Sequence, residues 1–142
     1  MIGKIYPRAA VSAIIVSEER ILLVRRGCEP NKGLWSLPGG SIEPGETMRE
    51  ALAREVMEET SLTVEVGEVA AVHEVISREN EELRYHYVIV NLFARVTAGE
   101  PSAGSDAAEV RWVPLDSIAE YPTTEGLVQR LRAAGVWRRA ED

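Results

Sequence analysis

Residues 39–62 read GGSIEPGETMREALAREVMEETSL, and this stretch decides how the middle of the chain folds. Thr47 and Glu50 have the spacing of a capping box, in which each side chain accepts a hydrogen bond from the other's backbone amide. The pattern predicts a helix over residues 48–59 with Thr47 as its N-cap. The Pro-Gly pairs that precede it predict a sharply turning loop, whose glycines let backbone amides approach a phosphate.

Three glutamates at the end of the predicted helix point to its chemistry. Glu55, Glu58 and Glu59 are spaced i, i+3 and i+4, so a helix aims them at one face. The last two fall in the final turn, where the helix dipole disfavours negative charge. Because this arrangement costs stability, we expect a cation to offset it, and a hard divalent ion bound by oxygen, Mg²⁺ or Mn²⁺, is the simplest candidate. The alternative interpretation is a solvated helix face with ion pairs.

The stretch resembles the signature of the Nudix hydrolases, G-x5-E-x7-R-E-U-x-E-E-x-G-U, where U is aliphatic. Gly40, Glu46 and the run REVMEE at residues 54–59 match it in register. Ser61 stands where the family has glycine, a residue suited to a left-handed helix end. The segments ILLVRRG, GLWSLPGG and SDAAEVRWVPL elsewhere in the chain extend the resemblance over most of the sequence.

This resemblance implies a fold and an activity. The expected fold is a single Nudix hydrolase domain over residues 1–142, an α/β/α sandwich with a central mixed β-sheet and a loop–helix–loop catalytic motif. The expected activity is Mg²⁺-dependent cleavage of the pyrophosphate bond of a nucleoside diphosphate linked to another moiety, with ADP-ribose or a related nucleotide sugar as substrate. The alternatives are a (deoxy)nucleoside triphosphate pyrophosphohydrolase that removes oxidised nucleotides, and a non-catalytic nucleotide-binding module of the same fold.

The resemblance also implies roles for the motif residues. Arg54 is expected to position carboxylates, and Glu46 to fold back onto Arg54. In the family, the equivalent of Glu55 also takes part in deprotonating the attacking water. The expected metal ligands are Gly40, Glu55, Glu58 and Glu59, and the expected catalytic residues are Glu46, Arg54, Glu55, Glu58 and Glu59.

Four further residues are candidates for contact with the substrate. Arg25 and Arg26 end a predicted strand, from which they either reach a phosphate or form surface salt bridges. Gly39 offers backbone close to a phosphate. Asp106 lies in the loop before the last predicted strand, where the family often adds an acidic residue, and the alternative there is a solvated loop.

The aromatic residues and the histidines are read separately. Trp35, Tyr85 and Tyr87 either stack on a nucleobase or belong to the core of their strands. His73 and His86 lack metal-ligand spacing, so we expect both to be structural.

Composition limits the class of partner. A chain of 142 residues suits one domain with one sizeable core. Its net charge of −7 argues against a nucleic-acid polymer, which needs a basic surface, but leaves room for a small nucleotide. Cys28 is the single cysteine, and no apolar run is long enough to span a membrane, so we expect a cytoplasmic protein. The family resemblance adds a homodimer as a possible assembly.

The remaining pattern predicts strands that alternate with two helices, which favours an α/β sandwich. A second helix over residues 125–134 is expected, capped by Thr124 and ended by Gly135. The two apolar runs at 9–16 and 21–26 are expected to form a hairpin or adjacent strands. The other predicted strands cover residues 35–37, 63–76, 82–96 and 110–113.

Overall fold

The central helix forms as its sequence predicts. In the computed structural model, which describes residues 4–136, helix α1 spans Met48–Thr60. The Thr47 hydroxyl accepts from the Glu50 amide at 3.1 Å, and the Glu50 carboxylate accepts from the Thr47 amide at 3.1 Å. At the other end Ser61 is left-handed, with φ of 66°, and its amide donates to the Met57 carbonyl. The capping box therefore begins the helix, and a left-handed residue ends it.

Replacing Ser61 by glycine is expected to raise the melting temperature slightly. A non-glycine residue in the left-handed region costs roughly 1 kcal/mol. The exposed bond from the Ser61 hydroxyl to the Ser102 carbonyl, at 3.0 Å, offsets part of that gain because the variant loses it. Thermal denaturation of the Ser61→Gly variant measures the balance, and a lower melting temperature would show that the hydroxyl bond matters more than the backbone strain.

The strands form two sheets. The first has the order β5–β1–β7–β6, and it is mixed because β1 pairs parallel to β7 whereas its other pairs are antiparallel. The second has the order β2–β3–β4, with β8 paired to β3. The strands are β1 Arg8–Ile14, β2 Val16–Ser17, β3 Arg20–Arg26, β4 Trp35–Ser36, β5 Gly39–Ser41, β6 Thr63–Glu79, β7 Glu82–Ala98 and β8 Ala107–Pro114.

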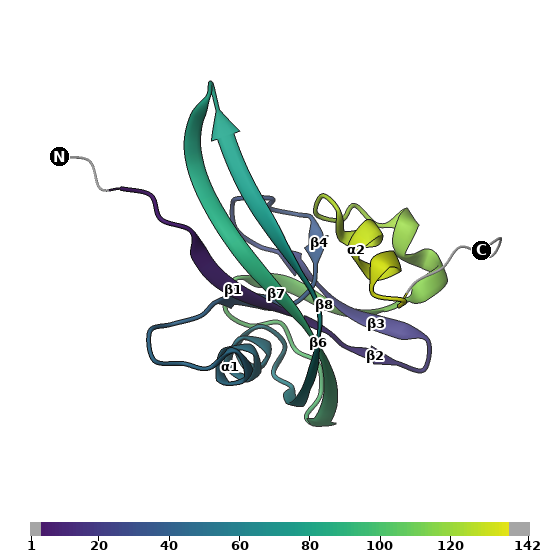
Figure 1. Ribbon diagram of the computed structural model, residues 1–142. Coiled ribbons are helices and arrows are strands. Elements are labelled where there is room, and N and C mark those ends of the chain that lie inside the picture. Colours follow the sequence, from purple (N-terminus) through teal and green to yellow (C-terminus); the bar gives the residue numbers. More distant parts are fainter. Residues whose placement is uncertain (1–3, 137–142) are drawn as a thin grey trace.

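Helices cover the two sides of these sheets (Figure 1). Helix α1 packs against β1, β5, β6 and β8 through one apolar cluster that includes Leu52 and Val56. A second cluster joins β3 and β8 to the 3₁₀ helix η1 (Leu115–Glu120) and to helix α2 (Leu127–Ala133). The alternation of a strand divides the two clusters, because Ala13 and Ile15 face α1 whereas Ile14 faces α2. The expected α/β/α arrangement is confirmed.

Long-range pairing changes three sequence expectations. The run at 9–16 does not form a simple hairpin with β3, because β1 pairs with β5 and β7 and only the short β2 pairs back onto β3. Gly39 and Gly40, expected in a loop, form β5 with Ser41 beside β1. Helix α2 begins later than predicted, after Gly126, because the Thr124 amide donates to the Trp35 carbonyl at 2.9 Å and ties that residue to β4.

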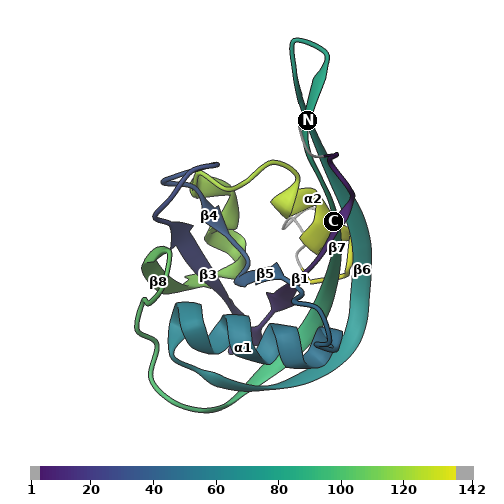
Figure 2. The same cartoon turned by 90° about the vertical axis from the view of Figure 1, so that its left-hand side faces the viewer.

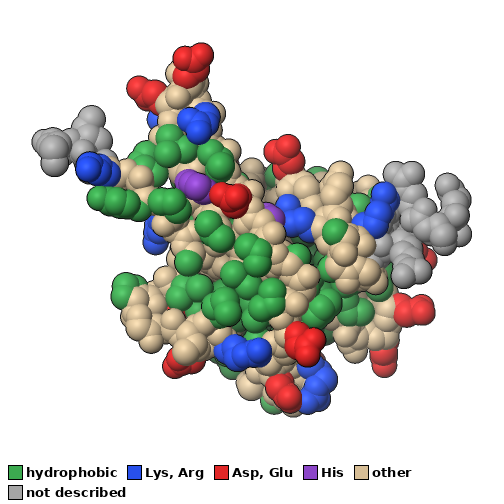
Figure 3. All heavy atoms as spheres, in the orientation of Figure 1, with side chains coloured by type: hydrophobic (Ala, Val, Ile, Leu, Met, Phe, Trp, Pro, Cys, Tyr) green, Lys and Arg blue, Asp and Glu red, His purple; other side chains and the backbone are tan. Residues whose placement is uncertain are grey.

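Strands β6 and β7 form a hairpin that extends beyond the rest of the molecule (Figure 2). Each strand has 17 residues, and their register shifts near Gly67, between Val66 and Val69. Apolar side chains are visible on the surface of this region (Figure 3), and Val69, Val72 and Ile76 of β6 are among the exposed ones. Within residues 4–136, no helix is long and apolar enough to cross a membrane.

Candidate active site

Arg54 joins the acidic side chains of the motif. Its Nε donates to Glu46 Oε2 at 2.6 Å and its Nη2 donates to Glu46 Oε1 at 2.9 Å, so the two side chains form a bidentate salt bridge. The same side chain donates to Glu55 at 2.9 Å, lies 3.4 Å from Glu58 and donates to the Ser41 carbonyl at 3.1 Å. Its pKa is raised, chiefly by the hydrogen bond to Glu46. Arg54 thus fastens α1 to the loop in front of it, and Glu46 folds back as the sequence suggested.

Replacing Glu46 by glutamine is expected to destabilise the fold in a pH-dependent way. The Arg54 hydrogen bond lowers the pKa of Glu46 from 4.5 to about 2. The folded carboxyl holds its proton less tightly than the unfolded one, so the stabilisation is complete above pH 4.5 and is lost as the pH falls toward 2. Urea unfolding of wild type and Glu46→Gln across this range should show a difference that shrinks with acid. A difference that stays constant from pH 7 to pH 2 would refute the ion-pair explanation.

Glu55 and Glu59 come together below strand β5. The Gly39 amide donates to Glu59 Oε1 at 3.2 Å, and a Cβ on Gly40 would lie 2.6 Å from Glu55 Oε1. Burial, together with the neighbouring Glu55 carboxylate, raises the pKa of Glu59 to about 8, against the lowering effects of the Gly39 amide and of Arg26. Because Gly39 and Gly40 of β5 have no side chains, the two carboxylates can approach the backbone of the first sheet.

Glu58 is placed differently from its two neighbours. Its side chain is 46% exposed and turns toward Arg54. Across residues 4–136, no three His, Cys, Asp or Glu side chains converge on a point where they would hold an ion. The predicted ligands therefore divide into a close pair, Glu55 and Glu59, and a more exposed third member.

The C-terminal turn of α1 carries negative charge without a basic residue of its own. Its carbonyls are capped by the loop that follows β7, since the Ser102 amide donates to Thr60 at 2.9 Å and the Gly104 amide to Glu59 at 3.1 Å. These bonds fix the backbone of Glu59 at the end of the helix.

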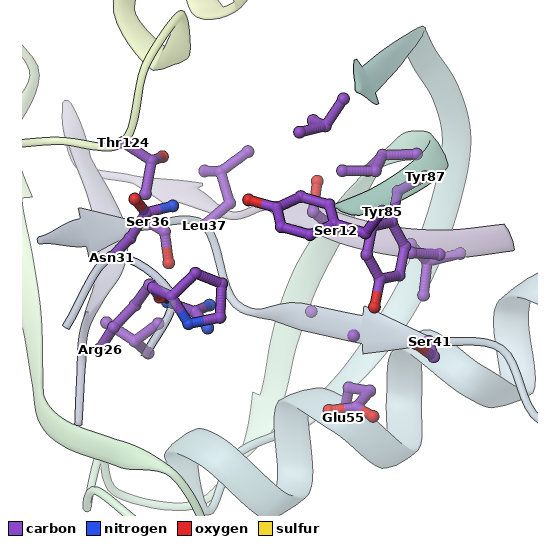
Figure 4. A pocket seen from close by; sticks show the side chains of 18 of the residues that line it. Ser12, Arg26, Asn31, Ser36, Leu37, Ser41, Glu55, Tyr85, Tyr87 and Thr124 are labelled. Atoms are coloured by element: carbon purple, nitrogen blue, oxygen red, sulfur yellow. Dashed lines mark hydrogen bonds between the residues drawn. The ribbon is translucent and has the colours of Figure 1, made fainter. Parts of the chain in front are cut away.

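A cavity of about 810 Å³ opens above the glutamate pair. Figure 4 shows Glu55 below β5, with Arg26, Asn31 and Ser36 along one side and the rings of Tyr85 and Tyr87 across from them. A volume of this size accommodates a small ligand of nucleotide dimensions. The cavity also contacts Gly39, Gly40, Glu59 and Asp106.

The four candidate substrate residues have different surroundings. Arg26 lines the cavity, and its Nε donates to the Pro30 carbonyl at 2.7 Å. Asp106 lies at the same cavity and accepts from the Cys28 thiol at 3.7 Å. Arg25, in contrast, is absent from the cavity lining within residues 4–136 and pairs with Glu109 at 3.5 Å.

The hairpin and α2 also supply cavity residues, and of these Arg130 is the one that the sequence analysis did not name. Tyr85, Tyr87 and His73 come from the inner face of the hairpin, whereas Trp35 is buried in the core against Tyr121. Arg130 of α2 also lines the cavity. No sequence signal identifies Arg130, because a basic residue on the polar side of a helix is ordinary and only the packing of α2 brings it here.

The donor set suits a hard divalent cation. Glu55 and Glu59 offer carboxylate oxygens that interact with each other, and β5 offers backbone beside them. A carboxylate whose pKa is raised by burial and by a like charge gains most from a nearby cation. The residues present therefore fit such an ion.

The sequence of this chain is similar to a known family and to named proteins. The family model described as NUDIX domain matches residues 6–133. A Methanocaldococcus jannaschii protein named ADP-ribose pyrophosphatase is 37% identical over 114 residues, which are 80% of this chain and 66% of that protein. A Bacillus subtilis protein named putative 8-oxo-dGTP diphosphatase is 31% identical over 109 residues, 76% of this chain and 66% of its own length. The chain thus spans about two thirds of each of these two relatives.

Solved structures agree with the sequence comparison. The crystal structure of a MutT NUDIX hydrolase from Burkholderia pseudomallei superimposes with a TM-score of 0.80 at 31% identity. The match covers 90% of this chain and 98% of that one. The architecture of two sheets between helices is therefore shared along nearly the whole of both chains.

Proposed function

Because this chain belongs to the Nudix hydrolase family, we propose that it is an Mg²⁺-dependent enzyme that hydrolyses the pyrophosphate bond of ADP-ribose or a related nucleotide sugar. The products are a nucleoside monophosphate and the phosphorylated remainder. The observation that carries this proposal is the Glu55–Glu59 pair, which lies beneath two glycines at the floor of an 810 Å³ cavity. Nudix hydrolases generally use divalent metal ions, and Mn²⁺ is expected to substitute for Mg²⁺.

We assign Glu55, Glu58, Glu59 and the backbone of Gly40 to metal binding. When bound, the ion supplies neutralisation of phosphate charge and a lowered pKa for water. Glu55 and Glu59 face the cavity, and we assign to Glu55 the further role of helping to deprotonate the attacking water. Arg54 and Glu46 act by holding Glu55 in place rather than by touching the substrate.

The remaining cavity residues orient the nucleotide. The Arg26 side chain, which acts electrostatically on Glu59, is close enough to the carboxylates to meet a phosphate on the same side. Gly39 presents backbone to that phosphate, and Asp106 borders the same end. Arg25 is proposed only to support this end through its pair with Glu109.

A panel of nucleotides tests the proposal. ADP-ribose, sugar nucleotides, dinucleotides and nucleoside triphosphates are assayed for phosphate released by a coupled phosphatase, with Mg²⁺, with Mn²⁺ and with EDTA. Glu55→Gln serves as the impaired variant, and Glu65→Gln, which changes an exposed glutamate paired with Arg95, serves as the matched control. We expect metal-dependent turnover of ADP-ribose by wild type and by the control. Silence across the panel would refute an enzymatic role and favour a binding module.

The second candidate function is hydrolysis of (deoxy)nucleoside triphosphates. It is favoured by the Bacillus subtilis relative whose name refers to 8-oxo-dGTP. The same panel separates the two, because a preference for a triphosphate over ADP-ribose keeps the carboxylate chemistry and changes the substrate.

The proposal includes a cytoplasmic location and a homodimer. A single cysteine is in keeping with a reducing compartment. The support for a dimer is strand β6, which lies at the edge of its sheet and exposes Val69, Val72 and Ile76. Light scattering would give twice the 15.7-kDa mass of the chain for a dimer.

A further inference from the structure

Arg130 is a partly buried cation in the cavity wall. Its Nη1 donates to the Glu125 carbonyl at 3.0 Å, but its Nε is fully buried and has no acceptor within the described part of the chain. Burial lowers the pKa of this guanidinium. A buried donor without a partner destabilises the folded protein, so its retention at a cavity requires a reason beyond packing.

The position of Arg130 separates it from the glutamate pair. The charge of Arg26 lowers the pKa of Glu59, whereas the charge of Arg130 lowers the pKa of His73 of β6. Both arginines line the same cavity. The two cations thus serve different regions, one beside the carboxylates and the other beside the hairpin.

The wall near Arg130 is aromatic. His73 is registered opposite Ile89, and Tyr87 and Tyr85 follow on the same face of β7 at steps of two residues. The two tyrosine rings meet with centroids 5.8 Å apart, and both line the cavity. Such rings offer a flat apolar surface, while Arg130 offers hydrogen-bond donors.

His73 does not satisfy the guanidinium. Its Nδ1 bonds the Asn91 amide oxygen at 3.1 Å, and the Asn91 amide nitrogen donates to the Ser12 hydroxyl. Burial and the Arg130 charge together lower the pKa of His73, so the imidazole is neutral at pH 7. The histidine is therefore held by its own network, and the Arg130 guanidinium, which lines the cavity and bonds Glu125 through Nη1, is left to donate to a ligand from its cavity side.

We propose that Arg130 binds a hydrogen-bond acceptor on the part of the substrate that lies away from the scissile pyrophosphate. This inference rests on the proposed function in that it takes a nucleotide as the ligand of the cavity. The acceptor is a ring nitrogen or carbonyl of the base, or an oxygen of the second sugar. These groups share the same chemistry toward a guanidinium, which only donates.

A purely structural role makes a different prediction. The bond to Glu125 closes the turn before α2, so a structural Arg130 would affect the melting temperature and leave ligand affinity unchanged. A ligand-binding Arg130 instead affects affinity, and its removal relieves the cost of an unpaired buried donor in the free protein.

The test combines binding without metal and steady-state kinetics. Arg130→Met keeps the apolar stem and removes the guanidinium, and Arg132→Met, at an exposed position of the same helix outside the cavity lining, is the control. Calorimetry in EDTA uses AMP, GMP and ribose 5-phosphate as probes. We expect Arg130→Met to bind at least one probe about 10-fold more weakly, and to raise KM by a similar factor with kcat within about twofold.

Each outcome decides a point. Weaker binding of AMP or GMP with unchanged binding of ribose 5-phosphate assigns the acceptor to the base, and weaker binding of ribose 5-phosphate assigns it to the sugar. Unchanged affinity and KM in a folded Arg130→Met variant would overturn the inference. If that variant does not fold, Arg130→Lys, which keeps the charge but loses the planar fork, is measured in its place and must show the same loss.

The experiment also separates this inference from the proposed function. Wild type that binds nucleotides through Arg130 but hydrolyses none would refute the enzyme and keep the binding residue. If wild type is active but its KM is the same in Arg130→Met, the proposed function stands and the role of Arg130 is refuted. If no probe binds in EDTA, the KM of Arg130→Met decides.

Discussion

Replacing Glu59 by glutamine is expected to lower turnover by ~10²–10³, the range typical of losing one electrostatic contributor in an active site. Glu59 is the buried member of the glutamate pair and lies at the cavity floor, so glutamine keeps its shape and its bond from the Gly39 amide but removes its charge. Steady-state assays of wild type and Glu59→Gln with Mg²⁺ measure the effect. Wild-type turnover in this variant would remove Glu59 from the site.

The same substitution is expected to stabilise the metal-free protein at alkaline pH. The pKa of Glu59 is 4.5 when unfolded and about 8 when folded, so the folded state holds a proton that the unfolded state has lost. Stability therefore falls as pH rises from 4.5 to 8, and glutamine removes that fall. Melting curves in EDTA at pH 5 and pH 8 should differ less for Glu59→Gln than for wild type. An equal pH dependence in both would show that Glu59 is not the group that titrates.

Alanine substitutions at the two glycines of β5 are expected to have different effects: Gly39→Ala should lower stability, and Gly40→Ala should lower activity. A Cβ on Gly39 would meet the Val11 carbonyl oxygen and lie 2.7 Å from the Ser12 Cα, which is backbone that cannot yield, so we expect a loss of about 3 kcal/mol in unfolding free energy. The atoms nearest to a Cβ on Gly40 are those of the Glu55 carboxylate, at 2.5–2.7 Å. Gly40→Ala should therefore fold but displace Glu55 and lose most of its turnover.

Urea unfolding and turnover of the two variants check this contrast. Gly39→Ala is expected to unfold at lower urea, and Gly40→Ala to unfold near wild type while its kcat falls by about 10-fold or more. An active Gly40→Ala would contradict the placement of Glu55 as a catalytic group. A fully stable Gly39→Ala would contradict the close pairing of β5 with β1.

Local signals predicted the motif and its helix. The capping box at Thr47, the fold-back of Glu46 onto Arg54 and the left-handed Ser61 all depend on residues close in sequence, and each has the geometry that its spacing indicates. In this segment the decisive contacts are short-range, so the pattern of residues contains most of the information.

Long-range contacts determine the features of the fold and the site that the sequence did not predict. Gly39 and Gly40 form a strand because β1 supplies a partner. Thr124 does not cap α2 because its backbone is tied to Trp35 of β4 and the left-handed Gly126 precedes the first helical residue. Arg130 reached the cavity only through the packing of α2 against the second sheet. Each outcome depends on elements far apart in the chain, which periodicity does not specify.

The most direct measurement separates the products of ADP-ribose by anion exchange after incubation with the protein. With Mg²⁺, wild type is predicted to give AMP and ribose 5-phosphate in equal amounts, and Glu59→Gln to give little of either in the same time. In EDTA, neither product should form. Intact ADP-ribose after incubation of wild type with Mg²⁺, or equal amounts of product with and without metal, would contradict the assignment of metal-dependent pyrophosphate hydrolysis to the Glu55–Glu59 pair.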